Sequence, residues 1–396
     1  MQSNERLIIK NFAGIKNIDI DLKRFTVFIG EQASGKSITS KVYFFLKSVF
    51  FNNFQKAIID NEKLGIDHIL DSVQDDFGQF FPFYMWRDDT FVLEWRKDDV
   101  WIKIAHRKQA KNIKVTYSPL LKDIYGKILE RVNIEEEKNQ GKRASGGFIF
   151  WDRWSVFFNV LRDYREQIGF ETVTYIPAGR SFFSTIQKTV FTLLAENKGI
   201  DPFLKEFGKF YEQIRDVVQH ANIDYTQDRG KKIESVLKGQ YAIDGRDYWL
   251  ICKNKKIRVA DTSSGQQEAL PLLLGLHALY RHIPSSVVIE EPEAHLYPLA
   301  QQTIVNLIYD LIGRDLIGRK IKLNRKCLLT THSPYILACV NNEIIKDENK
   351  RKNDVAAYHL HDGTATSIFN KGTGLIDATD FDELSFTIAN DSNKEE

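Results

Sequence analysis

The sequence has few cysteines and no long apolar run, and both shortages narrow the kinds of protein it can encode. Only three cysteines, Cys252, Cys327 and Cys339, occur among 396 residues. They are dispersed, odd in number and lack metal-ligand spacing, so we expect reduced thiols rather than disulfides or a zinc site. No stretch approaches the roughly 18 apolar residues that cross a bilayer, and residues 1–12 do not resemble a signal peptide. These absences predict a soluble, cytoplasmic protein without a membrane partner.

The sequence also lacks an excess of charge of either sign and a sustained heptad repeat. The formal net charge is +2, although 27% of the residues are charged. This balance argues neither for nor against nucleic acid, because a local basic patch is compatible with it. Without heptads, a long coiled coil is not expected. A chain of this length can bury a large core, as one domain with an insertion or as two domains.

What the sequence does contain is a phosphate-binding motif near its start. In FIGEQASGKS, residues 28–37, Gly30, Gly35, Lys36 and Ser37 satisfy the pattern G-x-x-x-x-G-K-[ST]. The apolar run before it predicts a buried strand, and the residues after it repeat apolar side chains at helical spacing. In such a loop the glycines let backbone N–H groups face phosphates, the lysine neutralises the β- and γ-phosphates, and the serine hydroxyl faces Mg²⁺.

Three further polar motifs end predicted strands or open a predicted helix. The apolar strand in VVIEEPEAH ends in Glu290 and Glu291, which suit Mg²⁺ binding and activation of water. His332 ends another apolar strand, at the edge where ligands gather in open α/β sheets. SSGQQE, residues 263–268, opens a helix; Ser264 predicts the N-cap, with Gln267 near the third helical position, and such a helix start also suits an anion. Each motif also has a simpler interpretation: Glu290 and Glu291 in a charged turn, His332 as a structural histidine, and residues 263–268 as a plain helix cap.

In this order, the motifs resemble those of the ABC-type ATPases of the SMC and OLD (overcoming lysogenization defect) group, also called AAA15- or AAA21-like. LIIKNFAGIKNIDIDL resembles that group's N-terminal strands, IEEPEAHLYP its Walker B and D-loop, TTHSPYIL its switch strand, and YIPAGR the segment before its signature. The resemblance covers roughly residues 5–51 and 171–340.

The resemblance implies an α/β fold, a P-loop NTPase of ABC-ATPase type. Such a fold has a mixed central sheet flanked by helices, an antiparallel β lobe and, in this chain, an α/β insertion. The implied domains are a discontinuous ATPase head, residues 1–51 and 171–396, and an accessory lobe, residues 52–170, made of a β-meander and helices.

The resemblance also implies a role for each motif residue. Lys36 and Ser37 would bind triphosphate and Mg²⁺, Glu290 would lie next to Mg²⁺, Glu291 would be the general base and His332 the switch. The implied nucleotide contacts are Gly30, Gln32, Ala33, Ser34, Gly35, Lys36, Ser37 and Ile38 in the loop, and Ser263, Ser264, Gly265 and Gln266 in a signature that acts on another subunit's ATP. Glu31 and Gln32 depart from the group's usual Pro and Asn, and Arg180 is either a phosphate or signalling arginine or a salt-bridge partner.

A signature that completes a partner's site implies a homodimer or higher homo-oligomer around two ATP molecules. The β-rich insertion disfavours a transporter ATPase. The short length of the same insertion excludes a long-armed SMC protein. The residues after His332 are too few for the Toprim domain of an OLD-like nuclease. HLHDG, residues 359–363, favours a strand and turn over a metal site.

We therefore expect an ATPase that uses ATP and Mg²⁺ and resembles the ATPase subunits of bacterial anti-phage systems of the Septu or PARIS kind. Such a subunit senses infection or holds a separate effector, a nuclease or toxin. The alternative is a DNA-associated ATPase of recombination or repair. It would bind duplex DNA through the basic stretches 107–114, 253–256 and 318–326, whose simplest interpretation is a solvated surface.

Overall fold

The computed structural model describes most of the chain, and every structural statement below concerns those residues. They are residues 5–59, 66–140, 159, 163–164, 172–185, 200–220, 223–244, 247–253, 255–281, 285–313, 325–347 and 351–379. The apolar spacing of the sequence also predicts an aromatic-rich helix over residues 148–168 and a helix over residues 182–197. Most of both segments, and the last seven residues, lie outside these ranges.

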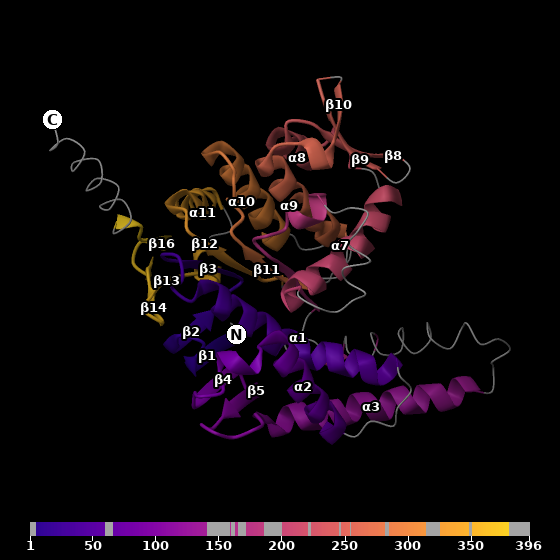
Figure 1. Ribbon diagram of the computed structural model, residues 1–396, viewed down its shortest axis with the longest axis vertical. Helices are drawn as coiled ribbons and strands as arrows, with labels where there is room; N and C mark the ends of the chain where they lie inside the picture. The colour runs from indigo at the N-terminus through magenta and orange to yellow at the C-terminus, as the bar shows by residue number, and fades with distance from the viewer. Residues whose placement is uncertain are drawn as a thin grey trace. The chain divides into compact units, whose positions relative to one another are not determined.

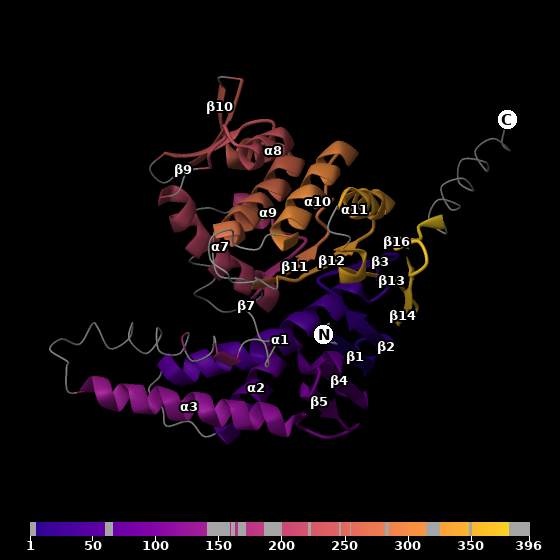
Figure 2. The ribbon, with the colours of Figure 1, turned by 180° about the vertical axis from the view of Figure 1, so that it is seen from behind.

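The chain forms two compact units, and it passes between them several times. Unit 1 comprises Met1–Leu22, Lys41–Val173 and Asp362–Thr364, and unit 2 comprises Lys23–Ser40, Thr174–His361 and Ala365–Glu396. One passage lies inside a helix, α1 (Lys36–Ile59), which begins in unit 2 and continues in unit 1 (Figures 1 and 2). The boundaries of the ATPase head and accessory lobe given above stay a prediction.

Unit 1 is built on an antiparallel sheet with strand order β6-β5-β4-β1-β2. Its first strand alternates, with Leu7 and Ile9 fully buried and Lys10 exposed, because successive side chains of a strand point to opposite faces. The N-terminal strands and the β-meander expected from the sequence are confirmed, whereas helix α2 was not predicted. The elements are β1 (Glu5–Phe12), β2 (Ile15–Leu22), α2 (Ile66–Phe80), η1 (Phe83–Met85), β4 (Phe91–Lys97), β5 (Val100–His106), β6 (Lys114–Tyr117) and α3 (Pro119–Gln140). The strand β14 (Thr364–Ser367) begins in this unit.

Unit 2 contains a sheet with strand order β13-β3-β12-β11-β7. Strand β3 (Phe25–Ile29) pairs in parallel with β12 (Cys327–Thr331) on one side and with β13 (Val355–His361) on the other, and β12 pairs in parallel with β11 (Ser285–Glu290). Every residue of β3 and β12 is buried, as expected of apolar strands covered on both faces. Because parallel strands end at the same edge, the motifs that follow β3, β11 and β12 meet there.

Three helices of unit 2 pack on this sheet and share its hydrophobic core. They are α9 (Ser264–Arg281), α10 (Pro298–Gly313) and α11 (Pro334–Lys346), and both ribbon views show them on the same side of β3, β11 and β12 (Figures 1 and 2). Their apolar faces therefore hold the ends of the central strands in place.

The rest of unit 2 contains two small antiparallel sheets, β10-β9-β8 and β15-β16. The remaining elements are β7 (Thr172–Ile176), α5 (Phe182–Thr185), α7 (Pro202–His220), α8 (Asp228–Leu237), β8 (Gln240–Asp244), β9 (Asp247–Cys252), β10 (Lys255–Arg258), η2 (Val259–Asp261), η3 (Arg351–Asp354), β15 (Phe369–Asn370) and β16 (Leu375–Ile376). Strand β13 runs into a turn in which Asp362 and Gly363 have positive φ, so the strand and turn predicted for HLHDG are confirmed.

Candidate functional site

The loop between β3 and α1 has the geometry of a phosphate cradle. A side chain at position 30 would place its Cβ 2.2 Å from the carbonyl oxygen of Leu360, so only glycine fits there. Gly35 has a φ of 98°, which favours glycine as well. The loop leads into the N-terminus of α1, where the first backbone N–H groups of a helix have no acceptor within the helix and attract anions.

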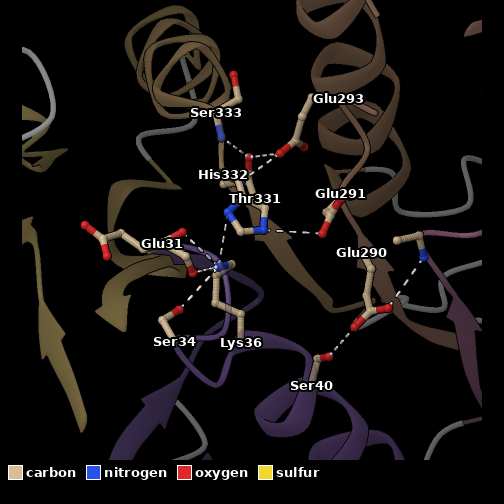
Figure 3. Close-up of polar contacts among 12 residues, drawn as sticks. Glu31, Ser34, Lys36, Ser40, Glu290, Glu291, Glu293, Thr331, His332 and Ser333 are labelled. Carbon is tan, nitrogen blue, oxygen red and sulfur yellow. Dashed lines mark hydrogen bonds and ion pairs between the residues drawn. The ribbon is translucent and has the colours of Figure 1, made fainter. Parts of the chain in front are cut away.

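Lys36 folds back into this loop, as Figure 3 shows. Its Nζ donates to the carbonyl oxygens of Gly30, at 2.8 Å, and Glu31, at 2.7 Å, and to Ser34 Oγ at 3.3 Å. Burial lowers the pKa of Lys36, and the nearby carboxylates, Glu291 first, oppose that effect. The loop oxygens bound by the ammonium group are neutral, so the oxygens of a phosphate would be stronger partners for it.

His332 lies between Lys36 and Glu291. Its Nδ1 is 3.4 Å from Lys36 Nζ, and its Nε2 is 3.4 Å from Glu291 Oε1 (Figure 3). Because a charged lysine only donates, Nδ1 acts as the acceptor, and the ring proton of neutral His332 is then on Nε2, facing Glu291. The side chains of His332 and Glu291 are 36% and 35% exposed, so solvent reaches both.

Glu290, by contrast, is buried, and the structure brings it to Ser40 rather than to Ser37. Its Oε1 lies 3.2 Å from Ser40 Oγ, and its Oε2 accepts the backbone N–H of Ala178 at 3.5 Å. Ser40 also lies 2.9 Å from the carbonyl oxygen of Ser37, one helical turn earlier, while Ser37 itself is exposed. Ser40 was not predicted from the sequence, although its position one helical turn after Ser37 was a signal for it.

Two more groups of this site were not predicted. Glu293 Oε1 accepts from Thr331 Oγ1 at 2.7 Å and from the His332 backbone N–H at 2.8 Å. Burial raises the pKa of Glu293. Tyr175 of β7 is fully buried near Glu290, and burial raises the pKa of its phenol as well. The third acidic residue in EEPE was the sequence signal for Glu293. Tyr175 is the first residue of YIPAGR, a segment that the resemblance singled out without giving this tyrosine a role.

The signature segment, residues 263–266, opens helix α9 with a reciprocal cap. Ser263 Oγ accepts the backbone N–H of Gln266 at 3.4 Å, and Gln266 Oε1 accepts the backbone N–H of Ser263 at 3.2 Å. The cap is therefore Ser263, one residue before the predicted Ser264, because this register lets a glutamine side chain return the bond. The Gln266 amide also donates to the carbonyl of Leu237 at 2.7 Å, while Ser263 and Ser264 are exposed.

The residues at the loop also suit a nucleotide-bound Mg²⁺. Within the described ranges no group of three or more His, Cys, Asp or Glu side chains is placed to hold a metal ion by itself. Mg²⁺ that arrives with a nucleotide needs only one or two protein oxygens, because phosphate and water fill its other positions. The carboxylate of Glu290 and the exposed hydroxyl of Ser37 at the start of α1 are donors of that kind.

Comparisons with solved structures gave matches of low identity. An SMC head bound to the C-winged helix domain of ScpA is 13% identical, with a TM-score of 0.44, and the match covers 92% of this chain and 96% of that chain. The SMC head domain from Thermotoga maritima is 12% identical (TM-score 0.38; 93% and 98% covered). An Smc head domain with an extended coiled coil, bound to a ScpA domain from Pyrococcus furiosus, is 11% identical (TM-score 0.39; 92% and 95% covered). No curated protein matched.

A family model, by contrast, matches the sequence itself. The AAA ATPase domain model, AAA_15, covers residues 92–337, more than half of the chain. The match includes the signature segment, Glu290, Glu291 and His332 but begins after the phosphate loop, whose assignment rests on its own motif and geometry. No helix in the described part of the chain is long and apolar enough to span a membrane. The fold class expected from the sequence, an α/β P-loop NTPase with a mixed sheet, is confirmed, and the chain belongs to the AAA ATPase domain family, whose members hydrolyse ATP.

Proposed function

We propose that this ATPase binds two ATP molecules between two copies of the chain and uses their hydrolysis to control a separate effector protein, a nuclease or toxin, in bacterial anti-phage defence. The observation that carries the ATP-site part is the contact series from Lys36 through His332 to Glu291. The defence role is supported by the resemblance of the motif order to compact ATPase subunits of such systems.

The residue roles follow from the geometry of the site. Lys36 exchanges its loop acceptors for phosphate oxygens when ATP binds, and His332 is then free to face the terminal phosphate. Glu291, partly exposed next to that position, takes the proton of the attacking water. Ser37 and Glu290 would hold Mg²⁺, which would neutralise charge on the phosphates. Glu293 fixes His332 through its backbone.

The requirement for a second copy rests on the start of helix α9. Ser263 and Ser264 are exposed there, while Gln266 and Gln267 are bonded within their own chain, to Leu237, Ala260 and Thr262. The exposed serines and the helix N-terminus suit the phosphate of a nucleotide held by another copy.

The test of the site is Glu291→Gln, with ATP binding, turnover and assembly measured on the purified protein. We expect ATP binding to be kept, turnover to fall by about 100-fold or more, and a dimer or larger assembly to accumulate with ATP in size-exclusion chromatography. Glu234→Gln, in α8 and outside the site, is the matched control and should turn over normally. Unchanged turnover in Glu291→Gln would contradict the role of this carboxylate.

The effector and the defence role need a different measurement. We expect the intact protein to co-purify with the product of a neighbouring gene. We also expect cells that express this product together with the Glu291→Gln variant to lose phage protection. Protection that survives Lys36→Ala and Glu291→Gln alike would count against an ATP-driven defence function.

One observation favours the DNA-associated alternative. Lys253, Lys255, Lys256 and Arg258 are exposed around β10, and Lys256 and Arg258 lie over the ring of Trp249. Lys256 is also paired with Asp244, which reduces the net charge of this surface. Stimulation of the ATPase by duplex DNA that weakens steeply with salt would favour this function over the defence role.

A further inference from the structure

Arg180 is completely buried just after strand β7, and it bonds three separate segments of unit 2. Its Nε donates to the carbonyl oxygen of Glu268 at 2.9 Å, and its Nη1 donates to those of Pro177, at 3.0 Å, and Glu290, at 2.9 Å. Its Nη2 donates to the carbonyl oxygen of Glu291 at 3.0 Å. Of the two roles left open by the sequence, contact with a phosphate does not fit a side chain without exposed surface, and the salt bridge to Glu268, at 3.6 Å, is one contact among several.

The bond to Glu291 fixes a strained residue. Glu291 has a φ of 43°, a conformation that is strained for a non-glycine residue and persists only where its surroundings enforce it. Its backbone N–H donates to Thr330 at 2.9 Å, and its carbonyl accepts from Ala294 at 3.1 Å as well as from Arg180. Arg180 therefore shares with Thr330 and Ala294 the role of holding the backbone from which the Glu291 carboxylate extends toward His332.

The other end of the contact lies in the first turns of α9. Besides accepting from Arg180, Glu268 uses Oε1 to accept the backbone N–H of Ser181 at 3.3 Å, and Ser184 Oγ donates to the carbonyl of Gln267 at 2.7 Å. A Cβ at Gly265 would lie 2.6 Å from the carbonyl oxygen of His295, so the helix start also packs tightly on the segment that follows Glu291. A shift of the signature segment would therefore change its contacts with the segment around Arg180 and with His295.

We propose that Arg180 is a positioning residue that couples the start of helix α9 to the backbone of Glu290 and Glu291, so that occupancy of the signature segment sets the orientation of the general base. This inference rests on the proposed function. Arginine suits the task because its planar fork donates in several fixed directions at once, whereas a lysine ammonium group is a single point on a flexible stem. When the signature segment of one chain binds the ATP held by the other copy, the general base of that first chain would be oriented for hydrolysis.

The test is Arg180→Lys in the full chain, measured by kcat, KM, binding of a non-hydrolysable ATP analogue and the midpoint of thermal unfolding. We expect kcat to fall by about 10-fold or more, because a small misplacement of a catalytic group is enough for that. Analogue affinity should stay within about 3-fold, and the Hill coefficient for ATP should fall to about one. Arg229→Lys is the matched control: Arg229 lies over Tyr280, near the other end of α9, and the change should leave kcat within about 2-fold.

Three results would overturn the coupling. The first is a normal kcat and Hill coefficient in Arg180→Lys. The second is a fall in kcat that matches the fall in the amount of folded protein and in analogue binding, as a merely structural role would produce. If Arg180→Lys does not fold, Arg180→Gln, whose amide donates in fewer directions, replaces it, and a normal kcat and Hill coefficient in that variant would be the third.

The outcome is separable from that of the proposed function. Lost turnover in Glu291→Gln with normal turnover in Arg180→Lys overturns the coupling and leaves the catalytic assignment standing. Unchanged turnover in Glu291→Gln overturns both. On the Glu291→Gln background, Arg180→Lys should cause little additional loss of turnover, because the two residues act through the same group.

Discussion

At the scale of single residues, Glu293 is a carboxyl group whose ionisation the fold opposes. Its Oε1 is bonded to Thr331 and His332, while within the described part of the chain its Oε2 has no partner. Burial raises the pKa of this carboxyl, with the charge of Glu291 acting in the same direction. A raised pKa in the folded protein means that its contribution to stability is complete below the unfolded value and is lost as pH rises through the folded value.

Glu293→Gln should therefore become more stable relative to the natural protein as pH rises. Glutamine keeps an acceptor for Thr331 and His332 and does not titrate. The midpoint of thermal unfolding, measured for both proteins from about pH 5 to about pH 8, should show a difference that grows in favour of the variant. Glu130→Gln, an exposed position on α3, is the control. A difference that stays constant across this range would mean that Glu293 titrates normally.

Among the elements, helix α9 combines a local cap with an exposed pair of serines. Ser263 makes the cap with Gln266, and the hydroxyl of Ser264 is exposed beside it. The two adjacent serines therefore have separable tasks, one in the stability of the helix start and one at its surface.

Ser263→Ala should cost about 1 kcal/mol at the start of α9, because it removes one side of the cap. Ser264→Ala should leave that stability unchanged and reduce ATP turnover, if the exposed hydroxyl meets a nucleotide held by another copy. Hydrogen exchange of the first turn of α9 checks the first expectation and steady-state ATPase assays check the second. A loss of protection in Ser264→Ala equal to that in Ser263→Ala would show that the register of the cap is different in solution.

On the scale of the whole molecule, both parts of the candidate site belong to unit 2, although they lie far apart in the sequence. The loop lies before residue 41, and the carboxylates and His332 come after residue 289. A ligand that binds the assembled site should stabilise the folded chain by mass action.

Addition of ATP and Mg²⁺ should raise the midpoint of thermal unfolding, in proportion to about 2.7 kcal/mol when ATP is at 100 times its Kd. Lys36→Ala should abolish most of this shift, because Lys36 is the cation of the loop. Lys127→Ala, whose side chain pairs with Asp123 on the surface of α3, should leave the shift unchanged. An equal shift in Lys36→Ala and the natural protein would place the ATP site elsewhere.

The sequence predicted most of what depends on local periodicity and spacing. The apolar run of β3, the glycine spacing of the loop and the strand ends at Glu290 and His332 all carried signals that the structure bears out as elements. The assigned roles of these residues stay predictions.

Features that depend on distant contacts were not readable from the sequence. Whether Ser263 or Ser264 caps α9 depends on where the Gln266 side chain folds, and that side chain is also held by Leu237. Arg180 donates hydrogen bonds to the carbonyl oxygens of Pro177, Glu268, Glu290 and Glu291. No local sequence pattern predicts that one arginine contacts these residues. Ser40 contacts Glu290 across a separation of 250 residues, longer than any spanned by the bonds of Arg180.

The position of β3 between β12 and β13 has a consequence for how the protein is made. The strand that carries the phosphate loop leaves the ribosome early, yet its two hydrogen-bonded neighbours are among the last strands to be synthesised. At ordinary rates of translation, the nearly all-apolar strand β3 is without these two neighbours for on the order of tens of seconds. Nascent chains should therefore depend on chaperones at this stage, and they should gain the ability to bind ATP only near the end of synthesis.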